Sequence, residues 1–168
     1  MESNRNWKKI TDGKYLFLVG EKKIGELELQ YSKWKRGAIF NIEGQIYTIE
    51  HFGFWKDKFQ IADYKGVSVL KAYTDKWFSS QTTLDYQNTK LLLKIRNNPL
   101  AEFVITNEVS DLLSYSLETN GGRIVTKIIS LPENQDYLLD FLLWYLFQPI
   151  AQENAGDQMV FQSLLMSL

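Results

Sequence analysis

The chain contains no cysteine and a single histidine, His51, among its 168 residues. Without thiols it can form neither a disulfide framework nor a cysteine-rich zinc site, and thiol catalysis is excluded. The formal net charge of −1 supplies no broad positive field for binding nucleic acid. A compact chain of this length buries about 68–70% of its unfolded surface, so a hydrophobic core can stabilise the fold without disulfides or a bound metal.

Long hydrophobic runs are missing too. The longest spans residues 137–147, is interrupted by Asp140 and is followed closely by Pro149. A membrane-spanning helix needs about 20 mostly apolar residues, so this run is too short. The first residues are polar and show no signal-peptide pattern. We therefore expect no transmembrane segment and a cytoplasmic location.

Aromatic residues are abundant, at 14% of the chain, and they favour strands. Between residues 7 and 130, short apolar runs alternate with turn-forming pairs such as Asp12-Gly13 and Glu43-Gly44, which suit antiparallel hairpins. The expected strands cover residues 7–10, 14–19, 22–31, 37–42, 45–51, 58–63, 66–73, 82–86, 89–96, 100–106, 112–118 and 123–129. The sequence predicts an all-β meander of about twelve antiparallel strands.

One predicted strand changes phase. Leu27, Leu29 and Tyr31 share one face, but Ile24 is out of step with them. Gly25 beside it predicts a β-bulge that restores the register.

A helix is predicted after the last strand, over residues 131–148. Ser130 and Glu133 have the spacing of a capping box, and Pro149 predicts the end of the helix at Gln148. The segment from Phe141 onward is apolar on every side and must be buried on every side. We expect residues 1–149 to form a closed barrel around this helix and residues 150–168 to form a tail or short helix. A helix packed between the sheet and a partner subunit is the alternative, and the oligomeric state stays open.

This order of elements, with its apolar segment at 137–147, resembles the tubby C-terminal-like superfamily, which includes LURP-one-related and phospholipid-scramblase-type proteins. The resemblance implies a twelve-stranded barrel that encloses a hydrophobic helix. It covers residues 7 to about 149 and carries no motif, so no functional residue is transferred from it.

Catalytic and metal-binding patterns are absent from the sequence, and no cofactor, metal site or catalytic residue is expected. His51 has no second histidine at a ligand spacing and is expected to be a dispensable strand residue. Glu26 and Glu28 share a strand face, and whether Glu50 of another strand joins them stays open; such an alternation is more typical of a solvated surface than of glycoside chemistry. Asp140 enters an apolar segment and is expected to pair with a lysine or arginine from a strand.

Three loops combine tryptophan with cations, and their tryptophans are 21 and then 22 residues apart. In a meander these loops share one end of the barrel, and together with two aspartates they carry a net charge of +4. The expected binding residues are Lys33, Trp34, Lys35, Arg36, Trp55, Lys56, Lys58, Lys76 and Trp77. An alternative interpretation has the indoles folding inward to plug the barrel while the lysines extend to solvent.

The sequence therefore favours a non-enzymatic binding or scaffold domain whose partner is an anionic lipid headgroup or an acidic protein segment, with no nucleic-acid partner. The alternative is a hydrolase that uses carboxylates at the mouth of the barrel.

Overall fold

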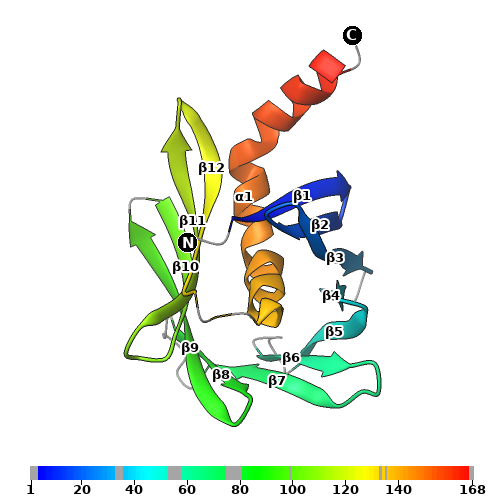
Figure 1. Cartoon of the computed structure of the whole chain (residues 1–168), viewed down its shortest axis with the longest axis vertical. Helices are drawn as coiled ribbons and strands as arrows, with labels where there is room; N and C mark the ends of the chain where they lie inside the picture. The colour runs from blue at the N-terminus through cyan, green and yellow to red at the C-terminus, as the bar shows by residue number, and fades with distance from the viewer. Residues whose placement is uncertain are drawn as a thin grey trace.

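The computed structural model describes residues 4–32, 36–52, 58–74, 81–98, 100–132, 134 and 136–166, with backbone only at 97–98 and 155–166. The described chain forms one sheet of twelve antiparallel strands whose order follows the sequence. The sheet curls into a nearly closed barrel, and helix α1 packs inside it (Figure 1). The predicted fold class, an all-β barrel with a C-terminal helix, is confirmed.

The strands lie close to their predicted positions. Their bounds are β1 Arg5–Thr11, β2 Lys14–Val19, β3 Lys22–Tyr31, β4 Arg36–Ile42, β5 Gln45–Phe52, β6 Lys58–Asp63, β7 Ser68–Tyr73, β8 Gln81–Tyr86, β9 Thr89–Asn98, β10 Leu100–Thr106, β11 Asp111–Asn120 and β12 Arg123–Ser130, followed by α1 Tyr137–Met166. The connections β1–β2, β3–β4, β5–β6, β7–β8, β9–β10 and β11–β12 lie at one end of the barrel, because each strand pairs antiparallel with the next. We call this end the rim and the opposite end the base.

The predicted bulge in β3 is confirmed. Phe17 of β2 pairs with Gly25, but the next residue, Leu18, pairs with Lys23, so Ile24 is the extra residue. A side chain at Gly25 would place its Cβ 1.9 Å from the carbonyl oxygen of Asn41. Glycine is therefore required by the close approach of β4, and the bulge returns the following residues of β3 to the inward-facing register.

The helix begins six residues later than the sequence predicts. Ser130 remains in β12, and the backbone N–H of Leu131 donates to the carbonyl oxygen of Leu112 at 3.1 Å. Ser130, which was expected to cap the helix, therefore belongs to the strand ladder. Glu133 lies outside the described residues. The cap is Asp136, whose Oδ1 accepts a hydrogen bond from the backbone N–H of Leu138 at 3.1 Å.

The predicted helix end at Gln148 is also wrong, because Pro149 lies inside α1. Both sides of the proline are tied to the barrel: the Tyr15 hydroxyl donates to Gln148 Oε1 at 3.2 Å, and the Gln152 amide donates to the same hydroxyl. Gln148 is almost fully buried. This anchoring offsets the backbone hydrogen bond that proline removes, and α1 continues past the rim (Figure 1). The separate role expected for residues 150–168 stays a prediction.

The enclosed part of α1 is buried on every side, as its sequence predicts. Its residues pack on aromatic and aliphatic side chains from the strands, including Phe17, Phe40 and Phe103. The buried helix residues are Leu138, Leu139, Asp140, Phe141, Leu142, Leu143, Trp144, Tyr145, Phe147, Gln148 and Ala151. The described part of the chain holds no helix with the length and hydropathy to cross a bilayer.

We predict that Leu143→Lys abolishes folding. Leu143 has no exposed surface, and a buried unpaired ammonium costs several kcal/mol against a total stability of about 5–15 kcal/mol. Thermal unfolding followed by circular dichroism tests this, with Lys71→Leu on the exposed outer face of β7 as the matched exchange of the same two residue types. A Leu143→Lys protein with an unchanged melting temperature would contradict the enclosed helix.

Candidate functional site

The predicted basic-aromatic loops lie mostly outside the described residues: Lys33, Trp34, Lys35, Trp55, Lys56, Lys76 and Trp77. The two described members, Arg36 and Lys58, begin β4 and β6 and are exposed. The strand order places both at the rim, where the β3–β4, β5–β6 and β7–β8 connections lie. Among the described residues, the rim consists of the strand ends that border those connections.

Each of two rim connections is bordered by an aromatic residue paired with a cation. Tyr31, which ends β3, pairs across the strands with Arg36, and Phe52, which ends β5, pairs with Lys58. Tyr31 is 67% exposed and Phe52 is 43% exposed. The sequence indicated neither aromatic as a surface residue: Tyr31 shares a face with Leu27 and Leu29 and therefore resembles a core residue, and Phe52 lies one residue beyond the expected strand 45–51.

Beneath this surface, Arg36 and His51 reach the enclosed helix. The Arg36 guanidinium lies 5.8 Å from the ring centre of Tyr145, a cation–π contact, and His51 Nε2 lies 2.7 Å from the Tyr145 hydroxyl oxygen. Burial raises the pKa of Tyr145, and Arg36 partly offsets this increase. His51 therefore contributes to packing between β5 and α1, and its dispensability for function stays a prediction.

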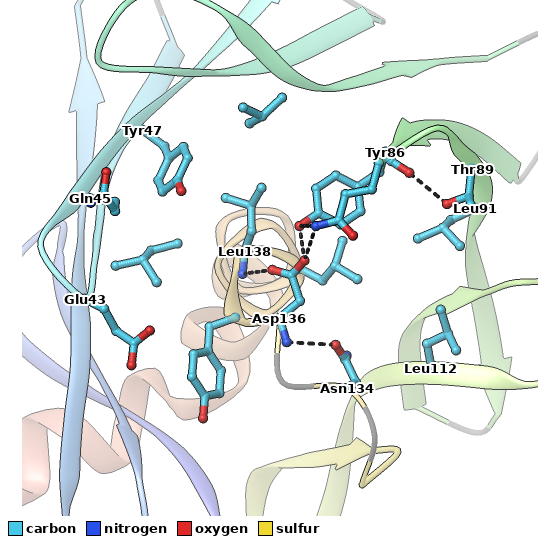
Figure 2. A pocket seen from close by; sticks show the side chains of 15 residues that line it. Glu43, Gln45, Tyr47, Tyr86, Thr89, Leu91, Leu112, Asn134, Asp136 and Leu138 are labelled. Atoms are coloured by element: carbon cyan, nitrogen blue, oxygen red, sulfur yellow. Dashed lines mark hydrogen bonds between the residues drawn. The ribbon is translucent and has the colours of Figure 1, made fainter.

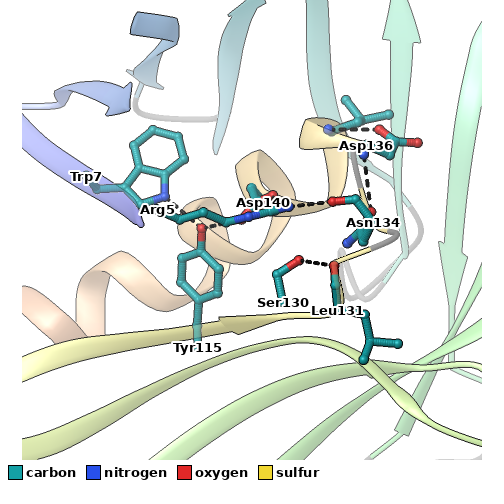
Figure 3. Close-up of polar contacts among 9 residues, drawn as sticks. Arg5, Trp7, Tyr115, Ser130, Leu131, Asn134, Asp136 and Asp140 are labelled. Carbon is teal, nitrogen blue, oxygen red and sulfur yellow. Dashed lines mark hydrogen bonds and ion pairs between the residues drawn. The ribbon is translucent and has the colours of Figure 1, made fainter. Parts of the chain in front are cut away.

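A second polar cluster joins β1, β11 and α1 inside the barrel (Figure 3). The Arg5 guanidinium forms an ion pair with Asp140, which has no exposed surface, and also donates to the backbone carbonyl of Asn134. The Tyr115 hydroxyl donates to Asp140 Oδ1 at 2.9 Å and accepts from Trp7 Nε1 at 2.8 Å. The strand cation expected for Asp140 is thus Arg5, and the cluster fastens the first strand to the last helix.

Burial governs the proton affinity of this carboxyl. Desolvation raises the pKa of Asp140 to about 7, and the charge of Arg5 and the hydrogen bond from Tyr115 lower it by less than burial raises it. Burial also raises the pKa of Tyr115 well above its ordinary value, and the adjacent Asp140 adds to this increase. Both groups are enclosed, so neither meets a substrate from solution.

Of the carboxylates on which the hydrolase alternative depends, Glu28 and Glu50 border one cavity, and neither Glu26 nor Asp140 joins them there. Glu26 pairs with Lys23 and Lys14 on the outer face. Glu28 and Glu50 are exposed and border a cavity of about 570 Å³ that also meets the outer face. Asp140, by contrast, is enclosed within the barrel. No group of three histidine, aspartate or glutamate side chains in the described residues could hold a metal ion.

A cavity of about 1040 Å³ lies at the base around the start of α1 (Figure 2). Asp136 accepts hydrogen bonds there from the Tyr86 hydroxyl and from Gln87 Nε2, the latter at 3.2 Å. Burial is the main cause that raises the pKa of Tyr86, and Asp136 adds to it. Because Asp136 also caps α1, these polar groups serve the helix start, and apolar side chains such as Leu112 form much of the remaining wall.

We predict that Arg5 and Asp140 are strongly coupled in stability. Arg5→Met removes the cation that lowers the pKa of Asp140, so at high pH it leaves a buried carboxylate without its cation and should cost about 3–5 kcal/mol of unfolding free energy. Adding Asp140→Leu removes the stranded charge, so the double variant should be more stable than the sum of the single losses by about 2 kcal/mol. Urea unfolding of the four proteins measures this coupling, and additive losses would show that the pair is not an energetic unit.

A second prediction concerns pH. Because the pKa of Asp140 is about 7 in the folded chain and about 3.8 as an unperturbed group, the folded chain keeps this proton between those values while the unfolded chain releases it. The unfolding free energy contributed by Asp140 should therefore fall as the pH rises from about 4 to 7 and stay level above that. The difference between wild type and Asp140→Asn in urea unfolding measures this slope. A difference that does not vary with pH would mean that Arg5 keeps Asp140 ionised throughout.

Searches of protein-family models, curated proteins and solved structures find no match for this chain. The resemblance to the tubby C-terminal-like superfamily therefore stays a prediction based on the order of elements.

Proposed function

We propose that the chain is a binding domain that attaches to an anionic lipid surface through the rim of its barrel. The observation that carries the proposal is that an exposed aromatic residue and a cation are register partners at two rim positions, Tyr31 with Arg36 and Phe52 with Lys58. Aromatic rings suit the boundary between water and acyl chains, and cations are drawn to anionic headgroups.

The distribution of charge supports the same surface. A chain with a net charge of −1 has no overall attraction to an anionic membrane, so the attraction must come from a local excess of cations. The sequence between these strand ends adds Lys33, Lys35 and Lys56. At the base, the described residues include the acidic Glu43 and Asp136 as well as the cations Lys22 and Lys90.

The carboxylates favour binding over hydrolysis as well. A glycoside hydrolase needs two carboxyl groups facing one substrate bond. Asp140 is enclosed with Arg5 and Tyr115, whereas Glu28 and Glu50 lie exposed near the outer face. A surface that presents cations and rings together needs no such convergence.

Co-sedimentation with phosphatidylcholine vesicles, with and without phosphatidylserine, tests the proposal at two salt concentrations. We predict binding only to the anionic vesicles and weaker binding at high salt, because ions screen exposed charges. Replacing Arg36 and Lys58 together by alanine should weaken binding about tenfold or more, at about 1 kcal/mol per cation near the surface. Replacing Tyr31 and Phe52 by alanine should weaken binding that persists at high salt.

The matched control removes two lysines from the base, Lys22 and Lys90, which changes the net charge equally. This variant should bind as wild type does. Equal weakening by both pairs would locate the attraction in net charge and not in the rim. No binding to anionic vesicles at low salt would overturn the lipid proposal and leave an acidic protein segment as the partner to test.

A further inference from the structure

The barrel has an opening between its first and last strands. Among the described residues, β1 and β12 pair only with β2 and β11, so the sheet ends in two edges. Figure 1 shows α1 between these two strands. A cavity of about 600 Å³ lies here, lined by residues of β1, β12 and α1. We call this region, bordered by residues 5–9 and 124–128, the seam.

The hydrogen-bond pattern shows which backbone groups face the seam from β1. In an antiparallel ladder, the N–H and C=O groups of successive residues point alternately to the two sides of a strand. Gly20 N donates to Asn4 O at 2.7 Å, so Asn4, Asn6 and Lys8 direct their groups toward β2. The backbone groups of Arg5, Trp7 and Lys9 therefore point into the seam.

The same reasoning applies to β12. Leu131 N donates to Leu112 O at 3.1 Å, and the ladder that continues from this pair directs the groups of Val125 and Lys127 toward β11. The backbone groups of Ile124, Thr126 and Ile128 point into the seam. Two rows of strand-edge donors and acceptors thus face one another, an arrangement that accepts an added strand.

On the α1 side of the seam, one hydrogen-bond donor has no acceptor among the described residues. Trp144 of α1 lines the cavity and is 7% exposed, and its Nε1 has no hydrogen-bond partner among the described residues. A buried indole N–H normally finds an acceptor. The neighbouring Trp7 does so, because its Nε1 donates to Tyr115. The seam therefore holds a polar group in need of an acceptor beside two rows of unpaired strand edge.

We propose that the seam binds an extended acidic peptide segment as an added β-strand. Its backbone would pair with the edge groups of β1 or β12, and one of its carbonyl oxygens would accept from Trp144 Nε1. This surface lies between the first and last strands and does not use the aromatic–cation pairs of the rim.

Charge and alternation define the peptide more closely. Arg123 and Lys127 of β12 and Lys8 of β1 alternate with inward-facing neighbours and lie on the exposed outer side of the seam. Side chains of an added strand alternate between the two faces. Those facing outward would lie beside these cations and should be acidic. Those facing inward would meet Trp144 and Ala151, so they should be apolar.

The direct test uses an acetylated peptide of alternating glutamate and valine, as long as the eight residues of β12. Affinity is measured by calorimetry, and amide hydrogen exchange by NMR locates the site. The peptide should slow exchange at the seam-facing amides of Trp7, Ile124, Thr126 and Ile128. A lysine–valine peptide and a glutamate–valine peptide with methylated backbone nitrogens should both bind at least about tenfold more weakly, for lack of charge complementarity and of strand pairing respectively.

Variants then assign the contacts. Trp144→Phe keeps a ring but removes the N–H, so it should weaken binding about three- to tenfold in protein that circular dichroism shows to be folded. Lys8→Glu should weaken binding, whereas Lys71→Glu, the same exchange on the outer face of β7, should not. A Trp144→Phe variant that loses stability but not affinity would assign this residue a purely structural role and overturn its part in the site.

Three results would overturn the seam itself. Slow exchange at its edge amides in the free, dilute protein would mean that β1 and β12 pair directly. Protection that rises with protein concentration and without peptide would mean that a second copy occupies the edges. Equal binding of the backbone-methylated peptide would mean that no strand is added.

Discussion

The fold depends on enclosing a helix that is apolar on every face. From Phe141 to Phe147 almost every side chain of α1 is buried, and this requirement determines how far the sheet must curl and which strand faces turn inward. The inward-facing side chains of Phe17, Phe40 and Phe103 pack their rings against Phe141 and Phe147 of α1. The one charge on the enclosed stretch, Asp140, is tolerated because Arg5 and Tyr115 approach it from two different strands.

The strands could be predicted because their signals are local. Alternation and turn residues repeat along the chain, and even the phase change at Ile24 was visible beside Gly25. The helix ends were misplaced where two local signals competed with tertiary structure. Ser130 is a good cap, but the pairing of β12 with β11 holds it in a strand. Pro149 is a good terminator, but Tyr15 anchors the residues on both sides of it.

The candidate sites were harder to predict because their parts are distant in sequence. Asp140 called for a cation, but nothing near it indicated Arg5, which lies 135 residues away. Tyr31 follows the pattern of a core residue and becomes exposed only because β3 extends past the core. The seam depends on which two edges remain unpaired once the sheet has curled, and no single segment carries that information.

The contact between the first strand and the last helix also sets an order of events during synthesis. Residues of β1 leave the ribosome long before the α1 residues that contact Arg5 and Trp7 are made. Until then the inward face of the growing sheet has no helix to cover it, and its apolar rows are open to other chains. A ribosome that stalls before residue 137 would release a sheet without its core, a natural substrate for chaperones.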